Sequence, residues 1–243
     1  DHSVGRILEK VKQIGRTENT LVMFLSDNGA SGEEILPNWQ GLDVPEKTRA
    51  GRAVQVGNNP NTMPGTEDAY QSYGVPWANV SNTPFRLYKR WVHEGGISTP
   101  LIVSWPAEIR TGGGLVHAPG HVVDVMATCC DVAGMRYPAR FAGYRLPPTE
   151  GVSLKPLLLG GTRQRGPLFW EHEGNRAVRQ GKWKLVAWFQ GPWQLYDMEA
   201  DRTEMNNLAD KNPTLVKFLT GLYDDWAERV QVEPWDASRS GDR

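Results

Sequence analysis

The strongest constraint on the fold is an unbroken apolar run, Leu21 to Leu25, that ends at the polar stretch "SDNGASGE". A strand that is apolar at every position is typical of a parallel sheet covered on both faces, whereas a strand with one solvated face alternates. The preceding residues 3–14 have apolar side chains at helical spacing and end at Gly15. A helix, a turn and a buried strand form half of an α/β unit. The sequence therefore predicts an α/β fold with a partial, mostly parallel sheet flanked by helices.

Further elements follow a long polar segment at 29–83, which is rich in Gly, Pro and Asn and has no sustained apolar period. A connection of this length is uncommon in a compact domain, so we expect it to be functional or partly disordered. The segment 84–92 is expected to contain a short helical piece, and "HEGG" a glycine turn. A second buried strand is predicted at 101–105, and the apolar face of 122–133 predicts a helix that stops at Gly134.

The character of the sequence changes near residues 161–166. Short strand candidates separated by glycine-containing turns occupy 168–198, which indicates antiparallel hairpins. A terminal helix with an apolar face begins at Asn212-Pro213. We therefore expect two domains, an α/β part at 1–162 and, at 163–243, a small C-terminal α+β subdomain with an antiparallel sheet and one terminal helix.

The overall charge excludes some partners. The chain has 27 basic and 28 acidic side chains and a formal net charge of -1, so it has no global field that attracts nucleic acid or an anionic membrane. No apolar stretch has the roughly 18 to 20 residues of a membrane span. The two cysteines, Cys129 and Cys130, are adjacent, which makes a disulfide between them sterically awkward.

Asp27 and Asn28 follow the first buried strand at the position where open α/β sheets usually bind ligands. A carboxylate and an amide carbonyl are hard oxygen ligands that suit Ca²⁺ or Mg²⁺ better than zinc. Two adjacent residues cannot complete a shell of six to eight ligands, so further groups must come from elsewhere. The alternative interpretation is a plain turn, since Asn28-Gly29 is a pair that tolerates positive φ.

A second cluster, "KRWVHEGG", contains Lys89 and His93. A lysine beside a divalent cation suits an anionic ester, because its point charge can hold sulfate or phosphate oxygens without a fixed geometry. His93 is a candidate for substrate binding, as a proton shuttle or a hydrogen-bond donor. The alternatives are a solvated surface lysine and a hydrogen-bonded structural histidine.

Six stretches in order resemble the C-terminal half of a type I sulfatase of the arylsulfatase group, in the alkaline-phosphatase-like superfamily. They are "TLVMFLSDNGASGE", "PFRLYKRWVHEGGISTPLIVSWP", "GHVVDVMATCCDVAG", "GVSLKPLLLG", "RQGKWKLV" and "WQLYDMEADRTEMNNLAD". The resemblance implies that Asp27 and Asn28 ligate an active-site Ca²⁺ and that Lys89 binds the sulfate group. It also implies that residues 1–162 are the C-terminal portion of a catalytic α/β domain.

This chain departs from the family pattern in two respects. The resemblance implies a formylglycine nucleophile made from a cysteine in a C-x-P-S-R motif, and neither Cys129 nor Cys130 lies in such a motif. We therefore expect the nucleophile in a missing N-terminal half of the same protein, and expect this chain alone to be inactive. Many relatives have an arginine where this chain has Ser98, so no ion pair of that arginine is carried over.

The resemblance thus predicts a fragment of a calcium-dependent sulfuric ester hydrolase that acts on aryl or carbohydrate sulfates. His172, with Asn175 and Arg176, could reach substrate from the C-terminal sheet, where tryptophans could stack on a sugar ring or simply pack. Two alternatives are a phosphodiesterase or phosphonate hydrolase of the same superfamily, and a relative that binds sulfated glycans without cleaving them. The family implies a periplasmic, extracellular or lysosomal location, which the residues neither support nor oppose.

Overall fold

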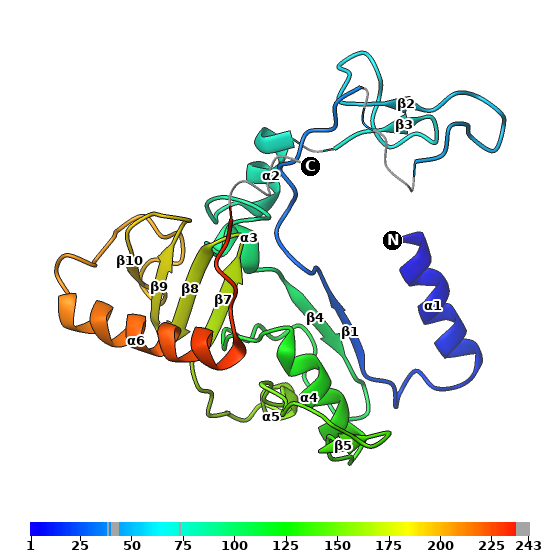
Figure 1. The fold of residues 1–243 in the computed structure, drawn as a ribbon. Coiled ribbons are helices and arrows are strands. Elements are labelled where there is room, and N and C mark those ends of the chain that lie inside the picture. The colour runs from blue at the N-terminus through cyan, green and yellow to red at the C-terminus, as the bar shows by residue number, and fades with distance from the viewer. Residues whose placement is uncertain (38, 40–43, 73, 237–243) are drawn as a thin grey trace. The chain divides into compact units, whose positions relative to one another are not determined.

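The computed structural model describes residues 1–37, 39, 44–72 and 74–236 (Figure 1). Contacts divide the chain into two compact units, each made of two segments. Unit 1 comprises 1–27 and 100–166, and unit 2 comprises 28–99 and 167–243. The change at 166 to 167 lies close to the predicted domain boundary, but residues 28–99 group with the C-terminal sheet rather than with the rest of 1–162. Each unit is therefore described by itself.

Unit 1 contains a two-stranded sheet of β1 (Val22–Leu25) and β4 (Leu101–Ser104). The prediction of parallel strands is wrong for this pair, because Leu25 lies opposite Leu101 and Val22 opposite Ser104 in an antiparallel ladder. The chain leaves β1 and returns to begin β4 at the same end of the sheet, so no crossover is made. Among the described residues, the parallel pairing is that of the two-residue strands β2 (Gln55–Val56) and β3 (Ala69–Tyr70) in unit 2.

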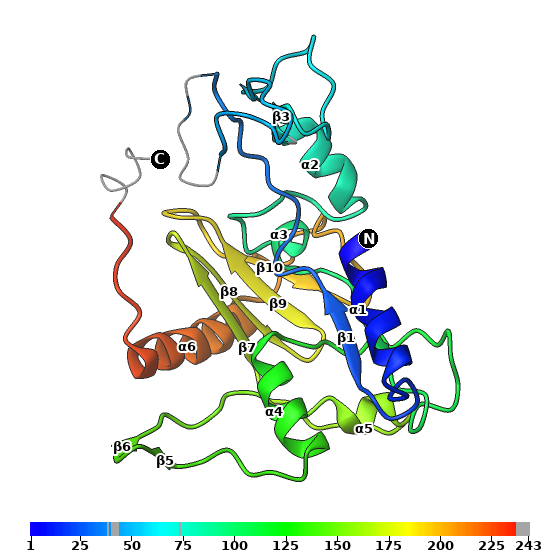
Figure 2. The ribbon, with the colours of Figure 1, turned by 90° about the vertical axis from the view of Figure 1, so that its right-hand side faces the viewer.

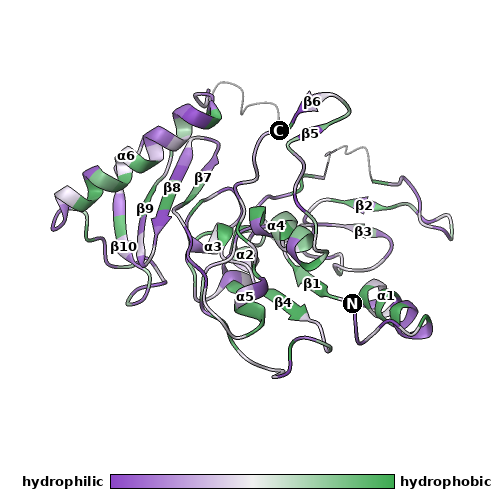
Figure 3. Cartoon of the chain, turned by 90° about the horizontal axis from the view of Figure 1, so that it is seen from below, coloured by the Kyte–Doolittle hydropathy of each residue, from purple (hydrophilic) through white to green (hydrophobic). Residues whose placement is uncertain are grey.

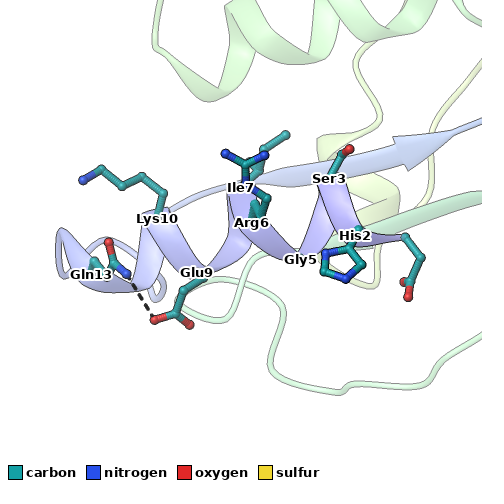
Figure 4. Close-up of a pocket in the computed structure, with 9 residues that line it drawn as sticks. His2, Ser3, Gly5, Arg6, Ile7, Glu9, Lys10 and Gln13 are labelled. Atoms are coloured by element: carbon teal, nitrogen blue, oxygen red, sulfur yellow. Dashed lines mark hydrogen bonds between the residues drawn. The ribbon is translucent and has the colours of Figure 1, made fainter. Parts of the chain in front are cut away.

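The two strands of unit 1 are also less covered than their apolar sequence predicts. Phe24 is 52% exposed and Ile102 is 62% exposed. Helix α1 (His2–Gln13) forms as predicted, but no residue of it is buried and Ile7 on its apolar face is exposed. Figure 4 shows the labelled side chains projecting from this one helix, with Gln13 Nε2 donating to Glu9 Oε1 at 3.5 Å.

Helix α4 (Val123–Val132) of unit 1 confirms the predicted helix that stops at Gly134, whose φ is +63°. Unit 1 also contains the strands β5 (Arg140–Phe141) and β6 (Tyr144–Arg145), which form a hairpin, and the short helix α5 (Lys155–Leu158). Cys129 and Cys130 on α4 are both free.

A buried carboxylate at the start of α4 organises this part of unit 1. Asp124 is fully buried and pairs with Arg163 at 3.1 Å and with Arg165. It also accepts hydrogen bonds from the backbone N–H groups of His121 and Val152, at 3.0 Å each. Burial by itself raises the pKa of Asp124, but these hydrogen bonds and the two guanidinium groups hold it below its ordinary value.

Unit 2 is built on a four-stranded antiparallel sheet in the order β10-β9-β8-β7, which confirms the predicted C-terminal sheet. The strands are β7 (Leu168–His172), β8 (Asn175–Gln180), β9 (Trp183–Ala187) and β10 (Gln194–Asp197). Helix α6 (Pro213–Val230) is the predicted terminal helix, and Figures 1 and 2 both show it lying along this sheet. Green and purple alternate along α6 in Figure 3, as an amphipathic helix requires.

Both faces of this sheet are buried. Val178, Leu185 and Leu195 pack on Leu219 and Tyr223 of α6. Successive side chains of a strand point to opposite faces of the sheet. On the face opposite α6, Ala177, Val186 and Tyr196 pack on Val92. The tryptophans of the stretch 170–185, Trp170 and Trp183, pack against these two clusters, and a role for them in sugar stacking stays a prediction. Two further tryptophans pack on aromatic rings: Trp226 stacks on Phe169, and Trp193 meets Tyr223 edge-on.

Val92 and Ile97, near the end of the segment 28–99 of unit 2, thus lie against the face of the sheet opposite α6. This segment contains β2, β3, α2 (Gly74–Asn82) and the short helix α3 (Glu94–Ile97). The helical piece expected at 84–92 does not form, since Leu87 and Arg90 have φ angles of 67° and 94°, which interrupt a helix. The predicted glycine turn at "HEGG" is instead the start of α3.

We predict that Asp124→Ala destabilises the protein by roughly 3 to 5 kcal/mol, because it leaves two buried guanidinium groups without their carboxylate. The matched control is Asp131→Ala on the same helix, where the carboxylate is partly exposed and lies 3.8 Å from Lys155. That change is expected to cost within about 0.5 kcal/mol in urea unfolding. Equal losses for the two variants would show that the buried cluster does not hold α4 in place.

Candidate functional site

The candidate site is centred on the turn after β1 and on the segment that carries Lys89. The two are joined by their backbones within unit 2: the Gly29 N–H donates to the Gly96 carbonyl at 2.9 Å, and the Lys89 N–H donates to the Ala30 carbonyl at 3.0 Å. Lys89 is therefore fixed beside the residue that lies two positions after Asn28. The turn after Asn28 and the segment of Lys89, 61 positions along the chain from Asn28, are thus joined within unit 2.

Three glycines allow this close approach. A side chain on Gly29 would place its Cβ 1.8 Å from the Gly95 carbonyl oxygen. The same atom on Gly95 would lie 2.1 Å from the Leu87 oxygen, and on Gly96 it would lie 1.8 Å from the Trp91 oxygen. None of these three glycines has a positive φ. The glycine after Asn28 is thus required by backbone contact, and the suggested reason of a turn with positive φ is wrong.

Asn82, the last residue of α2, bridges the two segments with its side chain. Its Oδ1 accepts a hydrogen bond from the Ala30 N–H at 3.0 Å, and its Nδ2 donates to the Leu87 carbonyl at 3.0 Å. No sequence pattern indicates this role, because Asn82 lies in a segment without recognisable periodicity. A single amide with both ends bonded fixes the spacing between the turn and the lysine segment.

The Lys89 side chain is 42% exposed, and its Nζ lies 3.6 Å from Glu33 Oε1. Glu33 is 76% exposed, so this pair is screened by water and contributes little to stability. An ammonium that is held by its backbone and balanced by a weak surface partner can exchange that partner for an anionic ligand. An anion-binding role for Lys89 stays a prediction.

Asp27 and Asn28 follow β1 directly, as predicted. Asp27 is exposed and Asn28 is half-buried. The Asn28 Nδ2 donates to the Gly29 carbonyl at 2.8 Å, which directs the nitrogen toward the backbone and leaves Oδ1 as the ligand atom in any metal site. These donors fit a hard cation, but among the described residues no group of three or more His, Cys, Asp or Glu could hold a metal ion. This part of the chain can supply two oxygens and not a complete shell.

His93 lies beneath this surface and has no exposed area. Its Nε2 lies 3.5 Å from Gln194 Oε1, and its ring stacks on Trp188 with the centroids 6.4 Å apart. Burial, followed by the charges of Lys184 and Arg86, lowers the pKa of His93 to about 4. The ring is therefore neutral at physiological pH, and its burial favours the structural alternative, while a substrate-binding role for His93 stays a prediction.

His172 is exposed at the end of β7, beside the turn that joins β7 to β8. Its carbonyl accepts a hydrogen bond from Asn175 Nδ2 at 2.9 Å, which fixes the backbone of the hairpin. The position is open to a ligand, and a substrate-binding role for His172 stays a prediction.

A buried ion cluster beneath the site was not predicted from the sequence. Lys184 of β9 is fully buried, with its Nζ 2.9 Å from Glu94 Oε1 and 2.8 Å from Glu204 Oε1. The second oxygen of Glu204 accepts a hydrogen bond from the Glu94 N–H at 2.8 Å. Burial alone raises the pKa of Glu94, but the Lys184 ammonium holds that pKa below its ordinary value. The signal in the sequence is a lysine between Trp183 and Leu185, since a charge inside an apolar strand is rarely found unpaired.

Arg202 completes the charge balance of this cluster. Its Nη2 lies 3.7 Å from Glu94 Oε2 and donates to Ser98 Oγ at 3.1 Å. Its guanidinium also lies over the Phe85 ring, 4.7 Å from the centroid. An arginine from the loop after β10 thus pairs with Glu94 and bonds Ser98, the position where the resemblance to sulfatases implies an arginine.

Comparison with known families gives two matches. The model of the Sulfatase family matches residues 1–135, and the model described as N-sulphoglucosamine sulphohydrolase, C-terminal, matches residues 85–224. Of the helices in the described part of the chain, none combines the length and apolar character needed to cross a membrane.

Curated relatives match most of this chain over a smaller part of their own. An uncharacterised sulfatase of Schizosaccharomyces pombe is 29% identical over 90% of the chain and 40% of its own length. An arylsulfatase of Klebsiella aerogenes is 33% identical over 65% of this chain and 32% of its own length. An N-acetylgalactosamine-6-sulfatase of Mus musculus is 26% identical over 83% of this chain and 30% of its own length. The chain therefore spans less than half the length of these relatives.

Solved structures show the same fold. The crystal structure of Ps i-CgsB has a TM-score of 0.61 and 20% identity, covering 93% of this chain and 40% of that one. A structure in complex with its substrate D-glucosamine-2-N,6-O-disulfate has a TM-score of 0.57 and 21% identity, covering 97% and 40%. These similarities confirm the predicted α/β class, with its small C-terminal antiparallel sheet and terminal helix.

We predict that His93 makes the protein less stable in mild acid. Its pKa is 6.5 when exposed and about 4 when folded, so the unfolded chain binds a proton between these values and the folded chain does not. The contribution of the neutral His93 ring to the free energy of unfolding is complete above pH 6.5. It falls by roughly 3 kcal/mol as the pH drops to 4. The free energy of unfolding, measured across this range, should fall more steeply for the parent than for His93→Gln.

The control is His117→Gln, at an exposed position, which should keep the parent slope. Parallel curves for the parent and His93→Gln would contradict a neutral buried ring.

Proposed function

This chain belongs to the sulfatase family, and we propose that the whole protein hydrolyses a sulfate ester. The observation that carries the proposal is the backbone junction between the Asn28 turn and Lys89, in which the Lys89 N–H donates to the Ala30 carbonyl at 3.0 Å. It joins the backbone of the turn after Asn28 to the residue that carries a positive side chain, which supports a site for an anionic ester. A lysine elsewhere on the surface would lack this connection.

The whole protein is proposed to be longer than this chain, with the nucleophile in an N-terminal part. Support comes from the relatives, of which the chain spans 40% or less, and from the exposed apolar side chains of β1 and β4. Strands that are apolar at nearly every position are normally covered, so another part of the protein is expected to pack on them. Neither Cys129 nor Cys130 has the sequence around it that a formylglycine precursor needs, and the proposed formylglycine therefore lies outside this chain.

The residues of this chain are proposed to bind and orient the ester. Asp27 and Asn28 would hold Ca²⁺ through their side-chain oxygens, and the ion would neutralise charge on the sulfate oxygens. Lys89 would hold a sulfate oxygen through its ammonium group and stabilise the charge that builds up as the alcohol leaves. The buried Lys184 cluster would keep this segment rigid without touching the substrate.

A sulfated carbohydrate is the proposed substrate class. Among the relatives, one is named N-acetylgalactosamine-6-sulfatase, and one solved neighbour holds a sulfated glucosamine. His172 at the open end of the β7–β8 hairpin is the residue of this chain proposed to reach the sugar. An exported or lysosomal location is proposed from the family resemblance.

We expect Lys89→Ala, in the whole protein, to lower kcat/KM on a sulfate ester about 100-fold to 1000-fold, because one charge that stabilises the transition state is lost. Lys89→Arg keeps the charge and should retain part of the activity. Lys217→Ala on the exposed face of α6 is the control and should match the parent.

Assays with an aryl sulfate and with a panel of sulfated sugars measure both rate and substrate class. Identical kinetics for Lys89→Ala and the parent would make Lys89 an ordinary surface charge, and binding without turnover in the parent would favour a non-catalytic glycan-binding protein.

Asp27→Ala should remove the stabilisation of the whole protein by Ca²⁺. A ligand that binds the folded state alone raises the free energy of unfolding by about 2.7 kcal/mol at a hundred times its Kd. The parent should therefore gain several degrees in Tm on adding Ca²⁺, and the variant little. Asp225→Ala, at an exposed position of α6, provides the control for loss of one carboxylate. A calcium-dependent rise in Tm that survives Asp27→Ala would exclude this residue as a ligand.

A further inference from the structure

The backbone on both sides of Lys89 is strained. Leu87 has a φ of 67° and Arg90 has a φ of 94°, and neither is a glycine. Long side chains seldom adopt this left-handed region, because Cβ crowds the following carbonyl. Such a conformation persists where the surroundings fix it, and strained residues tend to gather at functional positions. The contacts that hold Leu87 and Arg90 therefore indicate what sets the position of Lys89.

Two asparagine side chains hold the strained carbonyls. Asn82 Nδ2 donates to the Leu87 carbonyl at 3.0 Å, and Asn175 Nδ2 donates to the Arg90 carbonyl at 3.2 Å. Asn82 lies only five residues before Leu87, whereas Asn175 comes from the C-terminal sheet. The side chain of Arg90 is held as well, with its Nε 2.8 Å from Glu173 Oε2.

Asn175 uses the hydrogen-bonding capacity of both ends of its amide. It is 3% exposed. Besides the Arg90 carbonyl, its Nδ2 donates to the His172 carbonyl at 2.9 Å, and its Oδ1 accepts from the Phe189 N–H at 3.1 Å. The buried Asn175 side chain thus joins three stretches of backbone in unit 2. It cannot move away from one of them without breaking its hydrogen bonds to the other two.

The hairpin turn that carries these groups is itself constrained. Glu173 has a φ of 52° and Gly174 has a φ of 76°, and the Gly174 N–H donates to Glu171 Oε1 at 2.8 Å. A Cβ on Gly174 would lie 2.3 Å from the Phe189 ring. The turn between β7 and β8 is therefore a fixed support and not a free loop.

We propose that Asn175 and Glu173, on the β7–β8 hairpin of the C-terminal sheet, are positioning residues for Lys89. They hold the Arg90 backbone and side chain in the strained conformation, and the strain directs the neighbouring Lys89 side chain. Lys89 supplies the charge, and the hairpin supplies its position. The inference rests on the proposed sulfate-binding role of Lys89, although the support itself is a matter of contacts within unit 2.

Asn175→Asp separates this role from general packing. It is nearly isosteric and keeps the oxygen that accepts from Phe189, but it removes both donors and places a carboxylate against two carbonyl oxygens. Asn212→Asp is the matched control, because Asn212 Nδ2 donates to one backbone carbonyl, that of Leu208 at 2.9 Å, in the same unit. Glu173→Gln provides a second variant that keeps the size of the side chain and removes the ion pair with Arg90.

The first measurement is amide hydrogen exchange of residues 86–92 in the whole protein. We expect exchange in this peptide to rise about tenfold or more in Asn175→Asp, while α6 keeps the parent rate and Asn212→Asp leaves 86–92 unchanged. Glu173→Gln should raise exchange in the same peptide to a smaller extent. Unchanged exchange of 86–92 in both hairpin variants would overturn the inference, whatever the turnover. If Asn175→Asp does not fold, Glu173→Gln decides the outcome in the same way.

The second measurement is kinetic and uses an aryl sulfate as the probe. Asn175→Asp should lower kcat/KM about tenfold or more in the parent background and have little further effect in Lys89→Ala, because both changes act through the same ammonium. Independent, multiplying losses would contradict a role through Lys89. A parent protein without any turnover would contradict the proposed function alone. The exchange measurement would still test whether the β7–β8 hairpin holds the Lys89 segment in place.

Discussion

The buried ammonium of Lys184, between the carboxylates of Glu94 and Glu204, is the interaction on which the rest of unit 2 depends. Three buried charges are costly unless each is paired, and removing one partner of such a cluster typically costs roughly 3 to 5 kcal/mol. The cluster therefore tolerates one arrangement of β9, of the start of α3 and of the loop after β10. Arg202 at its rim balances the second negative charge while it remains partly exposed.

This constraint reaches the candidate site through the backbone. Glu94 begins α3, and the two glycines that follow it lie against carbonyl oxygens so closely that no side chain fits. Gly96 in turn accepts from the Gly29 N–H, which fixes the turn after β1 on that segment. Five residues before Glu94, Lys89 is held by Ala30 on one side and by the support from the β7–β8 hairpin on the other. We therefore propose that the C-terminal sheet determines where the Lys89 ammonium lies.

Local patterns predicted much of this structure, and contacts between distant segments account for what they missed. The short strands β7 to β10, separated by glycine-containing turns, and the apolar stripe of α6 are recognisable in the sequence, and both form as predicted. The direction of β1 relative to β4 was wrong, because an apolar run indicates burial and carries no information about which neighbour it pairs with. His93 and Lys184 show the same limit at the site, since a polar residue that is buried and one that faces a ligand look alike in sequence. The resemblance to sulfatases supplied Asp27, Asn28 and Lys89, and the structure brought Lys89 and the Asn28 turn together.

A crystal structure of the whole protein with Ca²⁺ and sulfate tests the central claim, that the Asn28 turn and Lys89 form one anion-binding site. The account predicts a Ca²⁺ ion about 2.3 to 2.6 Å from the side-chain oxygens of Asp27 and Asn28. It also predicts a sulfate oxygen within about 2.7 to 3.2 Å of Lys89 Nζ, in place of the contact with Glu33. A sulfate bound at the cation with the Lys89 ammonium still directed at Glu33, or a cation bound elsewhere, would contradict it.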